Sequence, residues 1–371
     1  MTIDLRTRRS DLSYDEIDTG GLTKSWLAAW RHSGEAVTGG VCVRSGISRY
    51  GPPTLSRCFP MGCLRFYLAL AVVAWHTSHG WLPFISGEWA VRVFFVISGF
   101  YMSLALSSKY GDARTFWLNR ALRLYPTYLL FVLIYWAWYF FTWMWLHKPP
   151  YGDWQVRYAA MEWWQAGLLV ISNWTMIGQD IPCLFNFSPV TGFTYPGSPD
   201  ALVDWAGRLR TIRPAWSLGT EAWFYLLVPF LVRLRTLHLL AIGTLSFSTF
   251  LFAPVFIAQF SLPTNLQFFI VGMLSFRHST LSMTFFKATA KRRFDQFLGN
   301  LSYPIYISHS IIAAMMLNIF HSDSFFVVSS LSVITAGFVY FFLERPINVW
   351  RSIPIRSDHA SGTMVLLPRP G

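Results

Sequence analysis

Apolar residues recur along the chain in blocks of about twenty, separated by short polar stretches. Nine blocks follow one another, at residues 62–82, 88–108, 124–146, 160–179, 214–232, 236–260, 264–277, 297–319 and 324–343. Most approach the length that a helix needs to cross a bilayer. The pattern predicts an all-α, polytopic integral membrane protein.

The two ends of the chain do not follow this pattern. Residues 1–60 mix acids with bases and run into Gly, Ser and Pro without an apolar core of signal-peptide length, so we expect a disordered cytoplasmic tail. A start codon assigned too far upstream is the alternative explanation. We expect the membrane domain at 61–350 and a second cytoplasmic tail at 351–371, with no soluble transfer domain after it.

Composition and charge refine the assignment. The chain is 53% hydrophobic and 13% charged, and its net charge is +12. Basic residues gather at the ends of apolar blocks, as in "NRALR" at 119–123, "RLR" at 233–235 and "KATAKRR" at 287–293. The positive-inside rule explains these clusters better than nucleic-acid binding does. The four cysteines show no metal-ligand spacing, so no metal site is expected.

The same charges predict a topology. The basic loops at 109–123 and 233–238 both read as cytoplasmic, yet three apolar blocks lie between them. An odd number of crossings cannot return the chain to the same side, so one block must fail to cross. The weakest block, 160–179, is expected to be re-entrant or interfacial, and a missed crossing is the alternative. We expect eight to ten spans in the plasma membrane and both termini in the cytoplasm.

Arg65 and His76 lie in one apolar block, eleven residues apart. Three helical turns separate them, so they share nearly the same face about 16 Å apart along the axis. An imidazole in a shielded cavity can take a proton from a hydroxyl nucleophile at neutral pH. We therefore consider His76 a candidate general base. The alternatives are an interfacial histidine satisfied by water, or a role for His79, one turn further on.

Glu221 is the only acid well inside a predicted span. A carboxylate there is costly unless it faces a cavity or a partner. We interpret it as a group that orients or charges a histidine, with His76 as the expected partner. The alternative is an ion pair that holds two helices together. For His309, in "YISHS", we expect a structural hydrogen bond.

Three arginines precede the third apolar block. Arg114, Arg120 and Arg123 lie in "RTFWLNRALRLYP". Topology alone would account for them, but their forked donors also suit the phosphates of an anionic cosubstrate. Both interpretations remain open from the residues alone.

Two further features of the second block are read as structural. Glu88 and Arg92 stand four residues apart and can pair along one helix face. Downstream, "ISGFYMS" at 97–103 brings small residues that permit close helix packing.

Six segments, in this order, carry a resemblance to a known family. They are "LRFYLALAVVAWH", "FFVISGF", "RALRLYPTY", "WSLGTEAWFYLLVP", "LSYPIYISH" and "FLERP". The first places Arg65 and His76 at the fixed positions of the R-x10-H signature. The chain thereby resembles the acyltransferase family 3 membrane proteins from residue 61 to about 350.

The resemblance implies a membrane O-acyltransferase of about ten helices. Such a protein moves an acyl group, most often acetyl from acetyl-CoA as cosubstrate, to a hydroxyl of a cell-surface glycan or related acceptor. It implies that His76 is the catalytic base, that Glu221 is required, and that Arg120 and Arg123 lie on the acyl-CoA side. The acceptor is not specified by the sequence.

Two departures and one rival class complete the assessment. Many members carry an acid where this chain has Arg92, and the stretch between Trp216 and Ser302 is short. A transporter or flippase of lipid-linked glycans would also place charges inside the membrane, although no inverted repeat is visible. A membrane scaffold without catalytic activity is disfavoured by the residues Arg65, His76 and Glu221.

Overall fold

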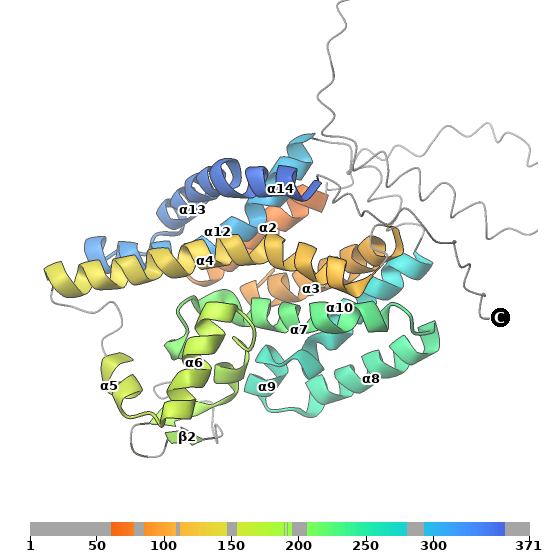
Figure 1. Cartoon of the computed structure of the whole chain (residues 1–371), viewed down its shortest axis with the longest axis horizontal. Coiled ribbons are helices and arrows are strands. Elements are labelled where there is room, and N and C mark those ends of the chain that lie inside the picture. The colour runs from red at the N-terminus through yellow and green to blue at the C-terminus, as the bar shows by residue number, and fades with distance from the viewer. Residues whose placement is uncertain are drawn as a thin grey trace, which may run out of the picture. The chain divides into compact units, whose positions relative to one another are not determined.

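The computed structural model describes residues 61–77, 85–108, 112–146, 154–188, 190, 192–194, 206–279 and 293–352. Helices dominate these residues (Figure 1). The long ones are α2 (Met61–Trp75), α3 (Gly87–Ser108), α4 (Ala113–Leu146), α7 (Trp216–Leu231), α8 (Thr236–Phe252), α10 (Leu262–His278), α12 (Arg293–Phe320) and α13 (Phe325–Val339). A π-helix, η5 (Tyr340–Glu344), joins α13 to α14 (Arg345–Ser352). The predicted helical membrane fold is confirmed.

Four helical stretches in the described part are long and apolar enough to cross a membrane. They are Gly87–Ser107, Ala113–Trp145, Arg293–Phe320 and Phe325–Trp350. The helices α2, α7, α8 and α10 are shorter, at 15 to 17 residues, and pack among the long ones. These eight helical segments coincide with eight of the nine apolar blocks.

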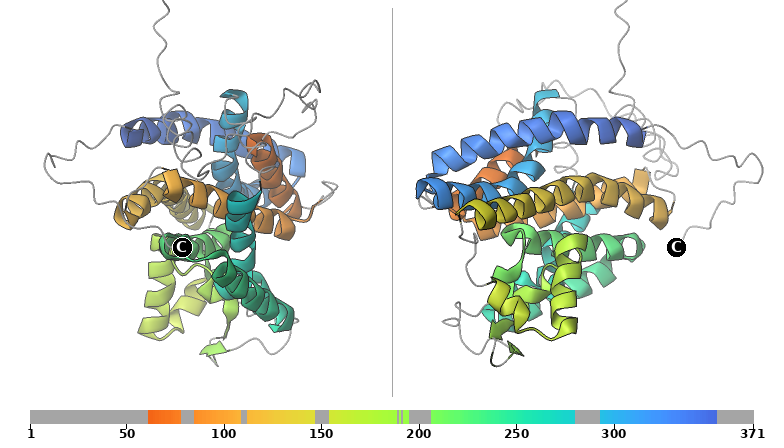
Figure 2. Two further views of the ribbon diagram at one scale, coloured as in Figure 1. Left: turned by 90° about the vertical axis from the view of Figure 1, so that its right-hand side faces the viewer. Right: turned by 60° about the vertical axis from the view of Figure 1, so that its left-hand side comes forward.

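The ninth block, 160–179, contains a short helix, α6 (Trp163–Thr175). Its 13 residues extend only about 20 Å, less than the roughly 30 Å of a hydrocarbon core. Met176 ends it in the left-handed region at φ 67°. Figures 1 and 2 show α6 running across the direction of α4 and α7. This agrees with the expected interfacial segment.

Small elements flank α6 along the chain among the described residues between 154 and 215. They are α5 (Trp154–Ala159), η1 (Ile181–Leu184), the antiparallel strands β1 (Asn186–Ser188) and β2 (Gly192–Thr194), η3 (Ala206–Leu209) and η4 (Arg213–Ala215). The buried amide of Asn173 binds the carbonyl of Leu209 and the amide nitrogen of Thr211. One polar side chain thus ties α6 to the chain that leads into α7. The hairpin was not predicted. Another short helix, α9 (Val255–Phe260), links α8 to α10.

Helices α3 and α10 touch through their backbones. A Cβ atom added to Gly99 would lie 2.0 Å from the carbonyl oxygen of Phe269, and one added to Gly272 would lie 2.0 Å from that of Val96. No larger residue fits at either position, which confirms the close packing expected of the small residues at 97–103.

Helices α2 and α12 lie side by side and run in the same direction (Figures 1 and 2). The carboxylate of Asp295 accepts the amide hydrogens of Gly62 at 2.9 Å and Cys63 at 2.8 Å. An acid from α12 therefore caps the amino terminus of α2, whose first amides have no partner within their own helix. Ala69 and Ile305, both 0% exposed, belong to the apolar contact that continues along the pair.

Candidate active site

His76 follows directly after the end of α2 and its side chain is exposed. Its Nδ1 atom lies 2.9 Å from the carbonyl oxygen of Val72. Because a carbonyl oxygen only accepts hydrogen bonds, Nδ1 carries the hydrogen in this arrangement. The neutral ring then has its lone pair on Nε2. The backbone thus presets the tautomer that a general base needs.

The partner of His76 is His309 on α12, which is 0% exposed. The Nε2 atom of His309 lies 3.3 Å from Nδ1 of His76, and the ring centroids are 5.1 Å apart. The Nδ1 atom of His309 lies 3.3 Å from the carbonyl oxygen of Ile305. The expected structural hydrogen bond of His309 is present, and the ring also contacts the candidate base.

Glu221, on α7, does not pair with His76 in this structure. Its Oε1 atom accepts hydrogen bonds from the hydroxyls of Ser98, on α3, and Tyr225, one turn further along α7. These two hydroxyls are the hydrogen-bond partners of the carboxylate within the described residues. The predicted contact between Glu221 and His76 is therefore wrong: Oε1 of the carboxylate is bonded to the hydroxyls of Ser98 and Tyr225 instead. A functional requirement for Glu221 stays a prediction.

The end of the helix bundle around His76 and His309 also holds arginines, and we call it the histidine end. The charges of Arg213, which is exposed, and Arg210, which is 2% exposed, act on the imidazole of His76. Next to His309, the hydroxyl of Tyr306 lies 2.6 Å from Ser217 Oγ. Sequence reasoning missed Arg210 and Arg213 because they come from the irregular segment before α7, and Ser217 and Tyr306 because they look like ordinary helix residues.

At the opposite end of α2 lie Arg65, Arg123 and Asp295, and we call this the arginine end. The charges of Arg65 and Arg123 both act on the hydroxyl of Tyr101 on α3. Three helices, α2, α3 and α4, therefore bring polar groups together there. Arg65 lies in the first half of α2 and His76 directly beyond its last residue, so the two occupy opposite ends of this helix as expected, although His76 itself is outside it.

The other two predicted arginines, Arg120 and Arg114, have different neighbours from those of Arg123. Arg120 is 9% exposed, with its guanidinium 5.7 Å from the ring centroid of Phe116, and its charge acts on Tyr225. Arg114 is exposed at the start of α4, next to Asp112. Arg120 thus faces the hydroxyl and carboxylate network of α7.

The ion pair between Arg92 and Glu88 is present as expected. Arg92 is 6% exposed, and its guanidinium also lies 4.6 Å from the ring centroid of Trp89 and 4.8 Å from that of Phe250. With the ring of Phe268 at 5.7 Å, three aromatic rings and one carboxylate stabilise this cation between helices. The pair has the surroundings of a structural contact.

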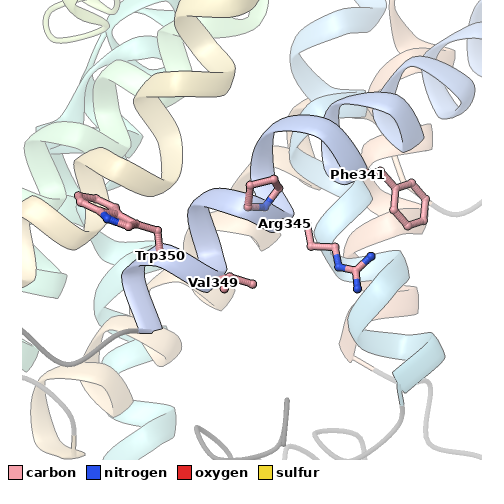
Figure 3. A pocket seen from close by; sticks show the side chains of 5 residues that line it. Phe341, Arg345, Val349 and Trp350 are labelled. Carbon is pink, nitrogen blue, oxygen red and sulfur yellow. The ribbon is translucent and has the colours of Figure 1, made fainter. Parts of the chain in front are cut away.

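Other candidate features are few in the described ranges. No group of three or more His, Cys, Asp or Glu side chains there can hold a metal ion. His79 falls outside the described residues, as do the tails at 1–60 and 353–371. A shallow pocket of about 480 Å³ lies at the junction of η5 and α14, where Arg345 is surrounded by Phe341, Pro346, Val349 and Trp350 (Figure 3). It includes none of the predicted site residues.

The family profile for the acyltransferase domain of acyltransferase family 3 matches residues 61–288, more than half of the chain. The chain belongs to acyltransferase family 3. The matched range of this family 3 protein contains His76, Glu221 and the arginine end apart from Asp295. It stops before His309, so the α12 partner lies beyond the matched residues.

Curated relatives are similar over less than half of the chain. The O-acetyltransferase OatA of Staphylococcus aureus is 26% identical over 174 residues, which are 46% of this chain and 24% of that protein. The putative peptidoglycan O-acetyltransferase YrhL of Bacillus subtilis is 30% identical over 173 residues, 45% of this chain and 22% of that protein. The family 3 chain thus matches about a quarter of each relative's length. No solved structure matches it.

Proposed function

We propose that the protein transfers an acetyl group from acetyl-CoA to a hydroxyl of a cell-surface glycan in the plasma membrane. The arginine end faces the cytoplasm, where acetyl-CoA is made, and the histidine end faces the glycan. Both chain termini are then cytoplasmic. The observation that carries the proposal is the exposed His76 ring, whose Nδ1 bond to Val72 leaves Nε2 as the basic atom.

The proposed transfer step uses His76 as the general base. His76 Nε2 takes the proton of the acceptor hydroxyl as its oxygen attacks the thioester carbonyl. The resulting tetrahedral oxyanion is stabilised by the positive charge of Arg213, which lies near the base. The C–S bond then breaks, the acetyl ester forms, and the CoA sulfur receives the proton from His76. The step thus moves one proton from the acceptor hydroxyl to the CoA sulfur and one acetyl group from that sulfur to the acceptor oxygen.

At the arginine end, the proposed ligand is the phosphate-bearing part of CoA. Arg65 and Arg123 act on one hydroxyl from two helices, so they can engage one anion together, and guanidinium forks suit phosphate oxygens. Arg120 lies one turn from Arg123 on the same helix, and exposed Arg114 adds charge at the start of α4. The acyl arm would reach His76 between α2, α3 and α12.

The test uses purified protein in proteoliposomes with radiolabelled acetyl-CoA. Peptidoglycan glycan strands serve as the first acceptor, because the Bacillus subtilis relative is named a putative peptidoglycan O-acetyltransferase. We expect CoA release that depends on the acceptor, together with base-labile acetyl esters on the glycan. Movement of a lipid-linked glycan across the bilayer without any CoA release would instead support the transporter class.

A further inference from the structure

We propose that His309 is a positioning residue for His76, accepting the Nδ1 hydrogen of the base in the place where a carboxylate was expected. This inference rests on the proposed role of His76 as general base. It assigns a function to a buried side chain that lies 233 positions away in the sequence and outside the matched family range.

The hydrogen-bond directions support one arrangement. The carbonyl of Ile305 requires a hydrogen on Nδ1 of His309, so Nε2 of the neutral ring carries the lone pair. That lone pair faces the Nδ1 hydrogen of His76 at a nitrogen–nitrogen distance of 3.3 Å. The hydrogen is shared with the carbonyl of Val72. Two acceptors therefore hold the ring of His76 by one edge and leave Nε2 on the other.

The helices that carry the two rings are fixed in register. Gly62 meets Asp295, and His76 meets His309, with the same sequence separation of 233 in both contacts. The two parallel helices therefore stay in step over 14 residues, from the carboxylate cap at one end to the imidazole pair at the other. His309 is 0% exposed and its ring centroid lies 6.1 Å from that of Tyr306. The acceptor has little freedom to turn away.

The positive charges near His76 give the acceptor His309 a role in stabilising the protonated base. The charges facing His76 are those of Arg210 and Arg213, which oppose the positive charge that the base acquires. A neutral imidazole that accepts the Nδ1 hydrogen favours the protonated ring without adding another full charge. Tyr306, the other titratable group beside His309, binds Ser217 Oγ and the carbonyl of Pro214. Besides the backbone carbonyl of Val72, Nε2 of His309 is the acceptor that faces Nδ1 of His76 in the described part of the chain.

The experiment compares two amides of different length. In His309→Gln the amide oxygen can reach the position of Nε2, whereas in His309→Asn it reaches only the position of Nδ1. We expect kcat to fall about 10- to 100-fold in the Asn variant, with the KM for acetyl-CoA unchanged, and to recover to within about fivefold in the Gln variant. Rates are normalised to the folded fraction from size exclusion. His321→Gln, an exposed histidine after α12, is the control.

A second readout separates positioning from packing. His309→Glu has the size of the Gln variant but carries a charge, so we expect the acidic limb of the pH–rate profile to shift to higher pH by about one unit relative to Gln. Equal kcat for the Asn and Gln variants per folded protein would overturn the inference. His76→Ala is assayed in parallel: if it stays active, the base assignment itself fails, whereas an inactive His76→Ala beside a fully active His309→Asn refutes only the role of His309.

Discussion

The two ends of the helix bundle both hold basic side chains, but of different kinds and in different arrangements. At the histidine end, two imidazoles contact each other beside the charges of Arg210 and Arg213. At the arginine end, the charges of Arg65 and Arg123 both act on the hydroxyl of Tyr101. Imidazoles exchange protons near neutral pH, whereas guanidinium groups keep their charge.

This difference indicates that the two ends suit different chemical steps. Proton transfer is suited to the histidine end, and anion binding to the arginine end. Glu221 lies with Ser98 and Tyr225 in a network that contacts neither histidine among the described residues. Among the described residues, the carboxylate of Glu221 therefore makes no hydrogen bond to the histidine end or to the arginine end. Variants of different regions should therefore affect different quantities: the turnover rate, the KM for acetyl-CoA, or the stability of the fold.

The largest effect is expected from His76→Ala at the histidine end. Removing the base should lower acetyl transfer by at least about 100-fold, since general bases contribute roughly 10²–10⁴. Membrane insertion should not change, because the ring is exposed. CoA release per folded protein measures this. Activity within a few fold of wild type would move attention to His79 or His309.

A smaller effect, on donor binding, is expected from replacing both Arg120 and Arg123 by Lys. Lys keeps the charge that orients the chain but loses the fork that binds phosphate oxygens. We expect the KM for acetyl-CoA to rise by the equivalent of about 1–3 kcal/mol, while acceptor dependence stays the same. An unchanged KM in a correctly oriented variant would reduce these arginines to topology signals.

Glu221→Gln should reduce turnover more modestly, by about fivefold, and more than it reduces folding. The amide oxygen can still accept from Ser98 and Tyr225, so only the charge is lost, and a distant charge acts weakly. The comparison of kcat with the yield of folded protein decides between the interpretations. A loss seen only as poor yield would show that the carboxylate is structural.

The smallest effect on turnover, within about twofold, is expected from Asp180→Asn. Burial raises the pKa of Asp180 to about 6, although Trp223 donates a hydrogen bond to it. The folded protein therefore holds this proton more tightly than the unfolded chain, so the contribution of Asp180 to stability is fully present below about pH 4 and is lost as the pH rises through about 6. The variant should flatten this dependence. Melting temperatures between pH 4 and 8 test it, and parallel curves would contradict it.

The sequence predicts those features that depend on local patterns. Hydropathy locates the helices, the four-residue spacing of Glu88 and Arg92 predicts their ion pair, and charge parity singles out block 160–179, where the structure has only the short helix α6. Each of these depends on neighbouring residues or on the side to which a loop belongs. These properties can be read from the local sequence without knowing which segments meet in the fold.

Contacts between distant segments could not be predicted in this way. His309 lies 233 residues from His76, and no periodicity links two separate helices. The hydroxyls of Ser98 and Tyr225 look like ordinary helix residues until tertiary packing brings them to Glu221. Glu221 is expected as the partner of His76 because it is the only acid well inside a predicted span. Tertiary packing instead brings two hydroxyls to its carboxylate.

The matched register of α2 and α12 has a consequence for insertions and deletions. Adding one residue between Gly62 and His76 would advance the imidazole by about 1.5 Å and turn it by about 100°, while the Asp295 cap held the start of the helix in place. The ring would then leave His309 altogether. An insertion of the same length between Asp295 and His309 would be needed to restore the contact. The lengths of these two helix segments can therefore change only together.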